Sequence, residues 1–62
     1  MTAHLVRALD PQGGQAFLCY KAPRLTPHRE EATRFTNAQA RYAAHAAREA
    51  RKGWTFTVEK AR

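Results

Sequence analysis

The sequence predicts an α+β fold in which an N-terminal β-hairpin and a C-terminal strand form a small sheet packed against one helix. Three observations support this prediction. Two short apolar segments flank a turn rich in glycine, an alanine-rich segment has a helical period, and the last residues alternate between apolar and polar. A chain of 62 residues with these elements is expected to form a single domain over residues 1–62.

The hairpin is predicted from residues 3–9 and 15–22, which are short apolar runs. Between them lies the sequence Asp-Pro-Gln-Gly-Gly, whose Gly13 and Gly14 favour a tight turn. In the second strand Phe17 is expected to face one side of the sheet and Leu18 the other. Both faces of the sheet are therefore expected to be partly covered.

The next segment predicts less regular structure. Residues 23–31 contain two prolines and several charged residues, and we expect them to form an exposed loop. Residues 32–35 are expected to add a short third strand before the helix, which gives the element order ββ(β)αβ. If this strand pairs in parallel with the last one, the crossover through the helix should be right-handed.

A helix is predicted from about Asn37 to Lys52 by signals at both of its ends. Thr36 and Gln39 have the spacing of a capping box, in which each side chain accepts a hydrogen bond from the backbone N–H of the other. Gly53 follows two cations and suits the turn out of the helix.

One face of this helix presents only methyl groups. It is predicted to be buried on the sheet, because its alanines recur at helical spacing. The partner surface should supply the large side chains, and Trp54, Phe56 and Val58 alternate in a way that fits this. The alanines of this face are Ala40, Ala43, Ala44, Ala47 and Ala50.

Composition narrows the classes of partner. Eleven Lys and Arg against five Asp and Glu give a net charge of +6, which favours nucleic acid, an acidic protein surface or an anionic membrane, or serves solubility alone. The lone Cys19 fits a reducing compartment. Because no run of residues has the length of a signal peptide or membrane span, we expect a cytoplasmic protein without a membrane partner.

The sequence offers little for catalysis. His4, His28, His45 and Cys19 lack the paired spacing of a metal site, so neither a metal nor a cofactor is expected. The adjacent Glu30 and Glu31 point in different directions, and the chain contains no serine. We therefore expect a protein that is not an enzyme.

A basic stripe along the helix is the remaining candidate site. Arg41, His45, Arg48 and Lys52 fall within one narrow sector of the helix. The stripe is interpreted as a solvated face, as a contact to nucleic-acid phosphates, or as a docking surface for an acidic protein. Tyr42 is expected to join such a contact, and the patch is expected to extend to Arg24, Arg29 and Arg34.

The order of these segments resembles that of the compact ββαβ proteins encoded by phages and other mobile elements, among which are the anti-CRISPR proteins. The resemblance rests on the short hairpin, on A-T-R-F-T-N-A-Q-A at the start of an Ala/Arg-rich helix, and on W-T-F-T-V in the last strand. It covers most of the chain but consists of size, order and style, so no functional residue is transferred by it.

The resemblance implies a stand-alone inhibitor in the host cytosol, which binds and blocks a host protein or nucleoprotein complex that has an acidic surface. Two alternatives remain at this point. One is a small basic accessory protein that binds nucleic acid without sequence specificity. The other is a homodimer formed through an exposed edge strand.

Overall fold

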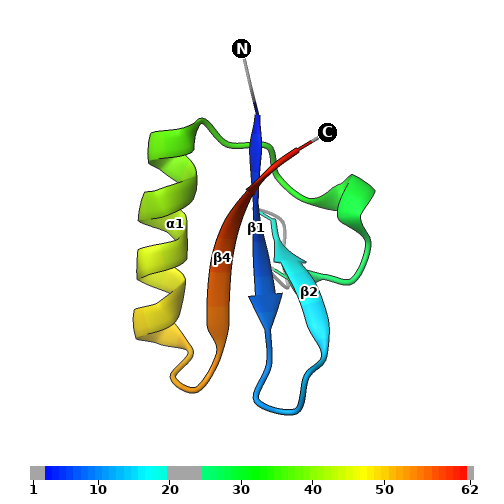
Figure 1. Cartoon of the computed structure of the whole chain (residues 1–62), viewed down its shortest axis with the longest axis vertical. Coiled ribbons are helices and arrows are strands. Elements are labelled where there is room, and N and C mark those ends of the chain that lie inside the picture. The colour runs from blue at the N-terminus through cyan, green and yellow to red at the C-terminus, as the bar shows by residue number, and fades with distance from the viewer. Residues whose placement is uncertain (1–2, 20–24, 62) are drawn as a thin grey trace.

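The computed structural model describes residues 3–19 and 25–61. These residues form a four-stranded antiparallel sheet with one α-helix packed on it (Figure 1). The strand order is β3-β2-β1-β4, so β1 lies inside the sheet and β4 forms one of its edges. The predicted α+β class is confirmed. The elements are β1 (His4–Leu9), β2 (Gln15–Leu18), β3 (Leu25–Thr26), the 3₁₀ turn η1 (Arg29–Glu31), α1 (Asn37–Ala50) and β4 (Thr55–Lys60).

The predicted hairpin is present as β1 and β2. Its turn is built around Asp10, whose Oδ1 accepts hydrogen bonds from the backbone N–H of Gln12 and Gly14 at 2.9 and 2.7 Å. Gly13 has φ +92°, a conformation that glycine adopts without steric cost. The second strand ends at Leu18, earlier than predicted, and residues 20–22 of the prediction lie outside the described residues.

The short strand expected at residues 32–35 is reduced to one bridge at Phe35, and the parallel pairing with the last strand that was considered for it does not occur. β4 instead pairs antiparallel with β1 over six residues. Phe35 forms a single antiparallel bridge with His4, in which the two residues exchange backbone hydrogen bonds of 2.8 and 2.9 Å. The reason is geometric: β2 pairs only with the later residues of β1, from Arg7 on, so the chain entering the helix can take the vacant edge beside His4.

The third strand lies instead within the segment predicted to be an exposed loop. Leu25 and Thr26 pair antiparallel with β2, and Thr26 is buried. The Thr26 hydroxyl donates to Glu31 at 2.8 Å and accepts from the backbone N–H of His28 at 3.2 Å, and these contacts hold η1 close to the sheet.

The ends of α1 follow the predicted signals. The capping box is formed, with Thr36 and Gln39 each donating a backbone N–H to the side chain of the other at 3.1 Å. The helix ends at Ala50, two residues before the predicted Lys52, and Gly53 then adopts φ +90° as the chain turns into β4. Within the described residues, no helix is both long and apolar enough to cross a membrane.

The helix lies over β4 and β1, on one side of the sheet (Figure 1). Ala40 and Ala44 are buried against Val6, Ala8 and Phe56. The predicted burial of the whole alanine face is corrected here, because Ala43 and Ala47 are half-buried and Ala50 is exposed. The helix lies mainly over β4 and β1. The rest of its alanine face therefore projects past these two strands toward β2.

Candidate functional site

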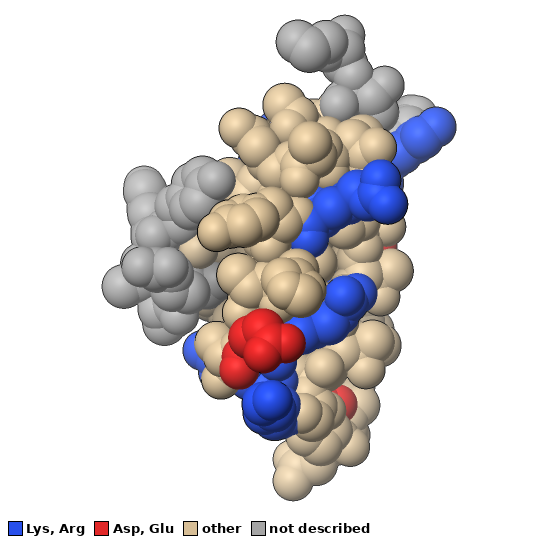
Figure 2. Space-filling model, turned by 90° about the vertical axis from the view of Figure 1, so that its left-hand side faces the viewer, with Lys and Arg blue, Asp and Glu red and all other residues tan. Residues whose placement is uncertain are grey.

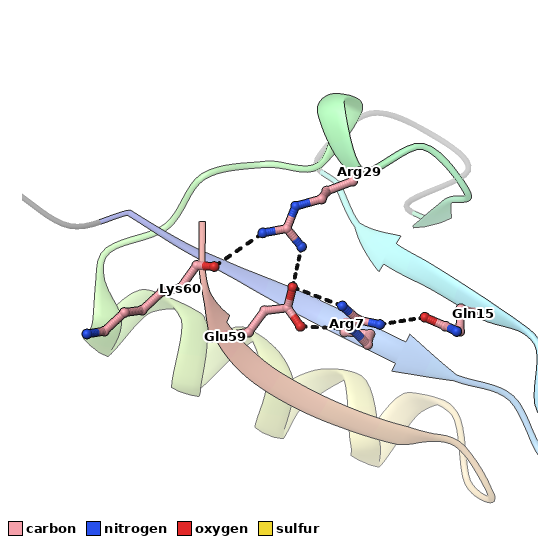
Figure 3. A network of polar contacts seen from close by, with 5 residues as sticks. All are labelled: Arg7, Gln15, Arg29, Glu59 and Lys60. Atoms are coloured by element: carbon pink, nitrogen blue, oxygen red, sulfur yellow. Dashed lines mark hydrogen bonds and ion pairs between the residues drawn. The ribbon is translucent and has the colours of Figure 1, made fainter. Parts of the chain in front are cut away.

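The face of the sheet opposite α1 carries a network of charged side chains (Figure 3). Arg7 donates to the carboxylate of Glu59 from Nε at 2.8 Å and from Nη2 at 3.2 Å, and to Gln15 from Nη1 at 2.6 Å. Arg29 reaches the same carboxylate from η1 and also donates to the backbone carbonyl of Lys60 at 3.3 Å. The network therefore ties η1 to strands β1 and β4.

Phe17 lies beneath these guanidinium groups and is only 7% exposed. The guanidinium carbons of Arg7 and Arg29 are 5.5 and 5.9 Å from the centre of its ring, within the range of a cation–π contact. Hydrogen bonding from Arg7 lowers the pKa of Glu59, against the opposing effect of partial burial, and Arg29 lowers it further. The hydrogen bond and charge of Glu59 raise the pKa of Arg7 in return.

Most acidic groups are occupied away from the helix. Glu59 serves the network just described, Asp10 holds the hairpin turn, and Glu31 accepts from Thr26. Within α1 the one acidic residue is Glu49. The cations on α1, and Arg51 and Lys52 after it, therefore have few acidic groups near them. Because exposed charges interact weakly across solvent, the more distant acidic groups compensate these cations only weakly.

Figure 2 shows Lys and Arg side chains in a row along one side of α1. Of the predicted stripe, Arg41, His45 and Lys52 are exposed, and their side chains form no hydrogen bond or ion pair with the part of the chain that the structure describes. Arg48 differs, because its Nη2 donates to the backbone carbonyl of Phe56 at 2.9 Å. Arg41, His45 and Arg48 thus share one side of α1, with Arg48 engaged by β4, while Lys52 follows the end of the helix.

The other predicted site residues are distributed differently. Tyr42 is 76% exposed on α1. Arg29 lies on the opposite face of the sheet and does not extend the stripe, because Glu59 holds it there. Arg34 is exposed and lines a small hollow of about 220 Å³ with Arg29, Glu30 and others, while Arg24 lies outside the described residues.

An apolar groove runs along the other flank of α1. The sequence analysis did not predict it. The groove has a volume of about 730 Å³ and is lined mainly by apolar side chains. A signal for it was present, since Ala38 and Ala46 make the apolar part of the helix wider than one buried face requires. Its lining includes Leu18, Phe35, Tyr42, Ala43, Ala46, Ala47 and Arg51.

Groups that could hold a metal ion were sought across residues 3–19 and 25–61, and no three of His, Cys, Asp or Glu lie close enough together there. No known protein family matches the chain, and neither does any curated protein or solved structure. The stripe, Tyr42 and the groove are therefore the features of this surface that could contact a partner.

Proposed function

We propose that this chain is a small non-catalytic binding protein that docks α1 on an acidic surface of a host protein or nucleoprotein complex and obstructs that complex, as an anti-CRISPR inhibitor does. The observation that carries the proposal is the surface of α1. Weakly compensated cations lie on one flank, Tyr42 is exposed, and an apolar groove lies on the other flank. Arginine and tyrosine beside apolar surface are typical of protein interfaces.

The nucleic-acid alternative has one observation in its favour. Arg41 and Arg48 are seven residues apart on α1, which corresponds to about 10 Å along the helix, and Lys52 follows beyond its end. Such a row could follow a phosphate backbone. The groove favours a protein partner instead, because a phosphate backbone offers no apolar group to fill it.

The proposal is tested by obstruction of a defined complex. Purified CRISPR effector complexes would be mixed with the chain, and complex formation and binding of target duplex DNA by the effector would be measured. We expect the double variant Arg41→Gln/Lys52→Gln to bind the inhibited effector at least about tenfold more weakly, since two contacts to charged groups are removed.

The matched control is Gln12→Glu/Gln15→Glu, which lowers the net charge by the same two units at the hairpin. It should obstruct as the unmodified chain does, because a Glu at position 15 still offers an acceptor to Arg7. The proposal is wrong if no effector forms a stable complex and target interference in cells stays intact.

A salt titration on duplex DNA tests the alternative. If Arg41, Arg48 and Lys52 each contact a phosphate, the log–log slope of affinity against salt should be about −2.7. Failure to shift duplex DNA at low salt would eliminate direct nucleic-acid binding.

A further inference from the structure

We infer that the groove beside α1 receives a linear segment of the acidic partner, which places an aliphatic or aromatic side chain in the groove and a nearby carboxylate against Arg51. This inference rests on the proposed function and specifies the chemistry of its partner. It follows from the lining of the groove and from the charge at its end.

The lining requires an apolar occupant. One wall consists of the methyl groups of Ala43, Ala46 and Ala47, and Leu18 and Phe35 line the side toward the sheet. The volume of about 730 Å³ lies within the range of about 300–1,000 Å³ that is typical of ligand sites. Within residues 3–19 and 25–61, the large side chains that line this flank leave a groove beside the alanines rather than filling it.

The charge at one end requires an anion. Among the described lining residues, Arg51 is the one that carries a full charge at neutral pH, and its guanidinium carbon is 5.3 Å from the centre of the Trp54 ring. This contact holds the guanidinium group at the end of the groove while its N–H groups can donate to a carboxylate. A segment with a lysine at the same place would be repelled.

The positions of the two features favour one short segment as the occupant. Ala46 lies on α1 and Arg51 directly follows the last residue of the helix, and both line the groove. In an extended segment, residues i and i+2 point to the same side and lie about 6.8 Å apart. A short extended segment can therefore direct an apolar side chain into the groove and a nearby carboxylate toward Arg51.

Two blocked pentapeptides test this inference on the purified chain. Their sequences are Ser-Phe-Thr-Glu-Ser and Ser-Phe-Thr-Gln-Ser, which differ only in the carboxylate. Binding would be followed by the fluorescence of Trp54, the only tryptophan of the chain, and by NMR of the alanine methyl groups. We expect the Glu peptide to bind about 1.5- to fivefold more tightly, the range of an exposed ion pair, and to shift the methyl signals of Ala43, Ala46 and Ala47.

Ala46→Glu should weaken binding of the Glu peptide by about tenfold or more, because it fills the groove and adds a like charge. Gln12→Glu makes the same change in net charge at the hairpin and should leave the affinity unchanged. The inference is overturned if the two peptides bind equally, if the groove methyl signals do not move, or if Ala46→Glu binds as tightly as the unmodified chain.

The effector assay separates this inference from the proposed function. If Ala46→Glu obstructs the effector normally while Arg41→Gln/Lys52→Gln does not, the groove inference fails and the proposed function stands. If no effector is bound but the Glu peptide still selects the groove, the proposed function fails and the groove remains an acidic-peptide site.

Discussion

Arg48 on α1 donates a hydrogen bond to the backbone carbonyl of Phe56 on β4, with 2.9 Å between Nη2 and the oxygen. Strand residues alternate in the edge toward which their backbone groups point, and Ala61 points toward β1, because its N–H donates to Ala3. Phe56 and Lys60 therefore point to the outer edge of β4. Arg29 donates to the carbonyl of Lys60 from the other face of the sheet, so arginines occupy two carbonyls of this edge.

Removing both arginines should expose β4 to pairing with a second copy, because open strand edges associate through their backbone groups. We expect Arg29→Ala/Arg48→Ala to self-associate at concentrations at which the unmodified chain does not, measured by sedimentation velocity over a range of concentrations. The control is Arg29→Ala/Arg41→Ala, which loses the same charge but keeps the contact to Phe56. Identical sedimentation of the two variants would contradict a protective role for Arg48.

Glu59→Gln should make the stability of the fold less dependent on pH. Because Arg7 and Arg29 lower the pKa of Glu59 in the folded chain, the carboxylate stabilises the fold above its unfolded pKa of about 4.3. This stabilisation is lost as the pH falls through the lower folded pKa. At pH 7 we expect a loss of about 1 kcal/mol, which corresponds to a Tm about 4–8 °C lower in a domain of this size.

Thermal unfolding of Glu59→Gln followed by circular dichroism at pH 7 and pH 3 would measure this effect. The difference in Tm from the unmodified chain should shrink at the lower pH. Glu30→Gln is the matched control. Because Glu30 is exposed, this substitution should leave the Tm unchanged at both pH values. An equal difference in Tm at both pH values would show that the charge of Glu59 is not the cause.

Thr36→Ala should destabilise the fold by about 1 kcal/mol, because it leaves the N–H of Gln39 without its capping acceptor. Chemical denaturation at neutral pH would measure the loss. Asn37→Ala changes the adjacent exposed residue and leaves the capping box intact, so it should have a much smaller effect. Equal losses from the two substitutions would mean that general helix propensity, rather than the cap, dominates.

Gly53→Ala should also destabilise the fold, by about 1–3 kcal/mol, because a Cβ disfavours the φ of +90° found there. Space is not the cause, since the nearest atom to an added Cβ is Cγ of Pro11 at 3.5 Å. Urea unfolding would be compared with that of Lys52→Ala, which alters the preceding residue. A neutral Gly53→Ala would show that the turn can relax at no cost.

The elements predicted correctly are those whose signals are local. The capping box of Thr36 and Gln39, the turn at Gly13 and the alternation from Trp54 to Val58 each depend on residues close together in the chain. β3 was not predicted because two residues are too few to show a period, and because its pairing depends on residues that lie seven and nine positions away in the chain. The position of Phe35 depends on where β2 ends, which no local pattern specifies.

The same distinction holds for the candidate site. That Arg41, His45 and Arg48 share one side of α1 follows from helical spacing alone, whereas Lys52 lies beyond the end of the helix. The engagement of Arg48 by Phe56 and the removal of Arg29 to the opposite face depend on tertiary contacts, with the ion pair of Arg29 spanning thirty residues. The groove depends on how far across the sheet the helix lies, which its own sequence does not specify.

The pairing of β1 with β4 also determines when this chain can fold. His4 pairs with Lys60 and Leu9 with Thr55, so one neighbour of the inner strand follows it by 46 to 56 residues along the chain. During translation the hairpin and α1 can form from local contacts, but the helix lacks Phe56 beneath it. Because closing such a long loop is slow compared with local folding, the sheet and the surface of α1 should take their final arrangement only after β4 has left the ribosome.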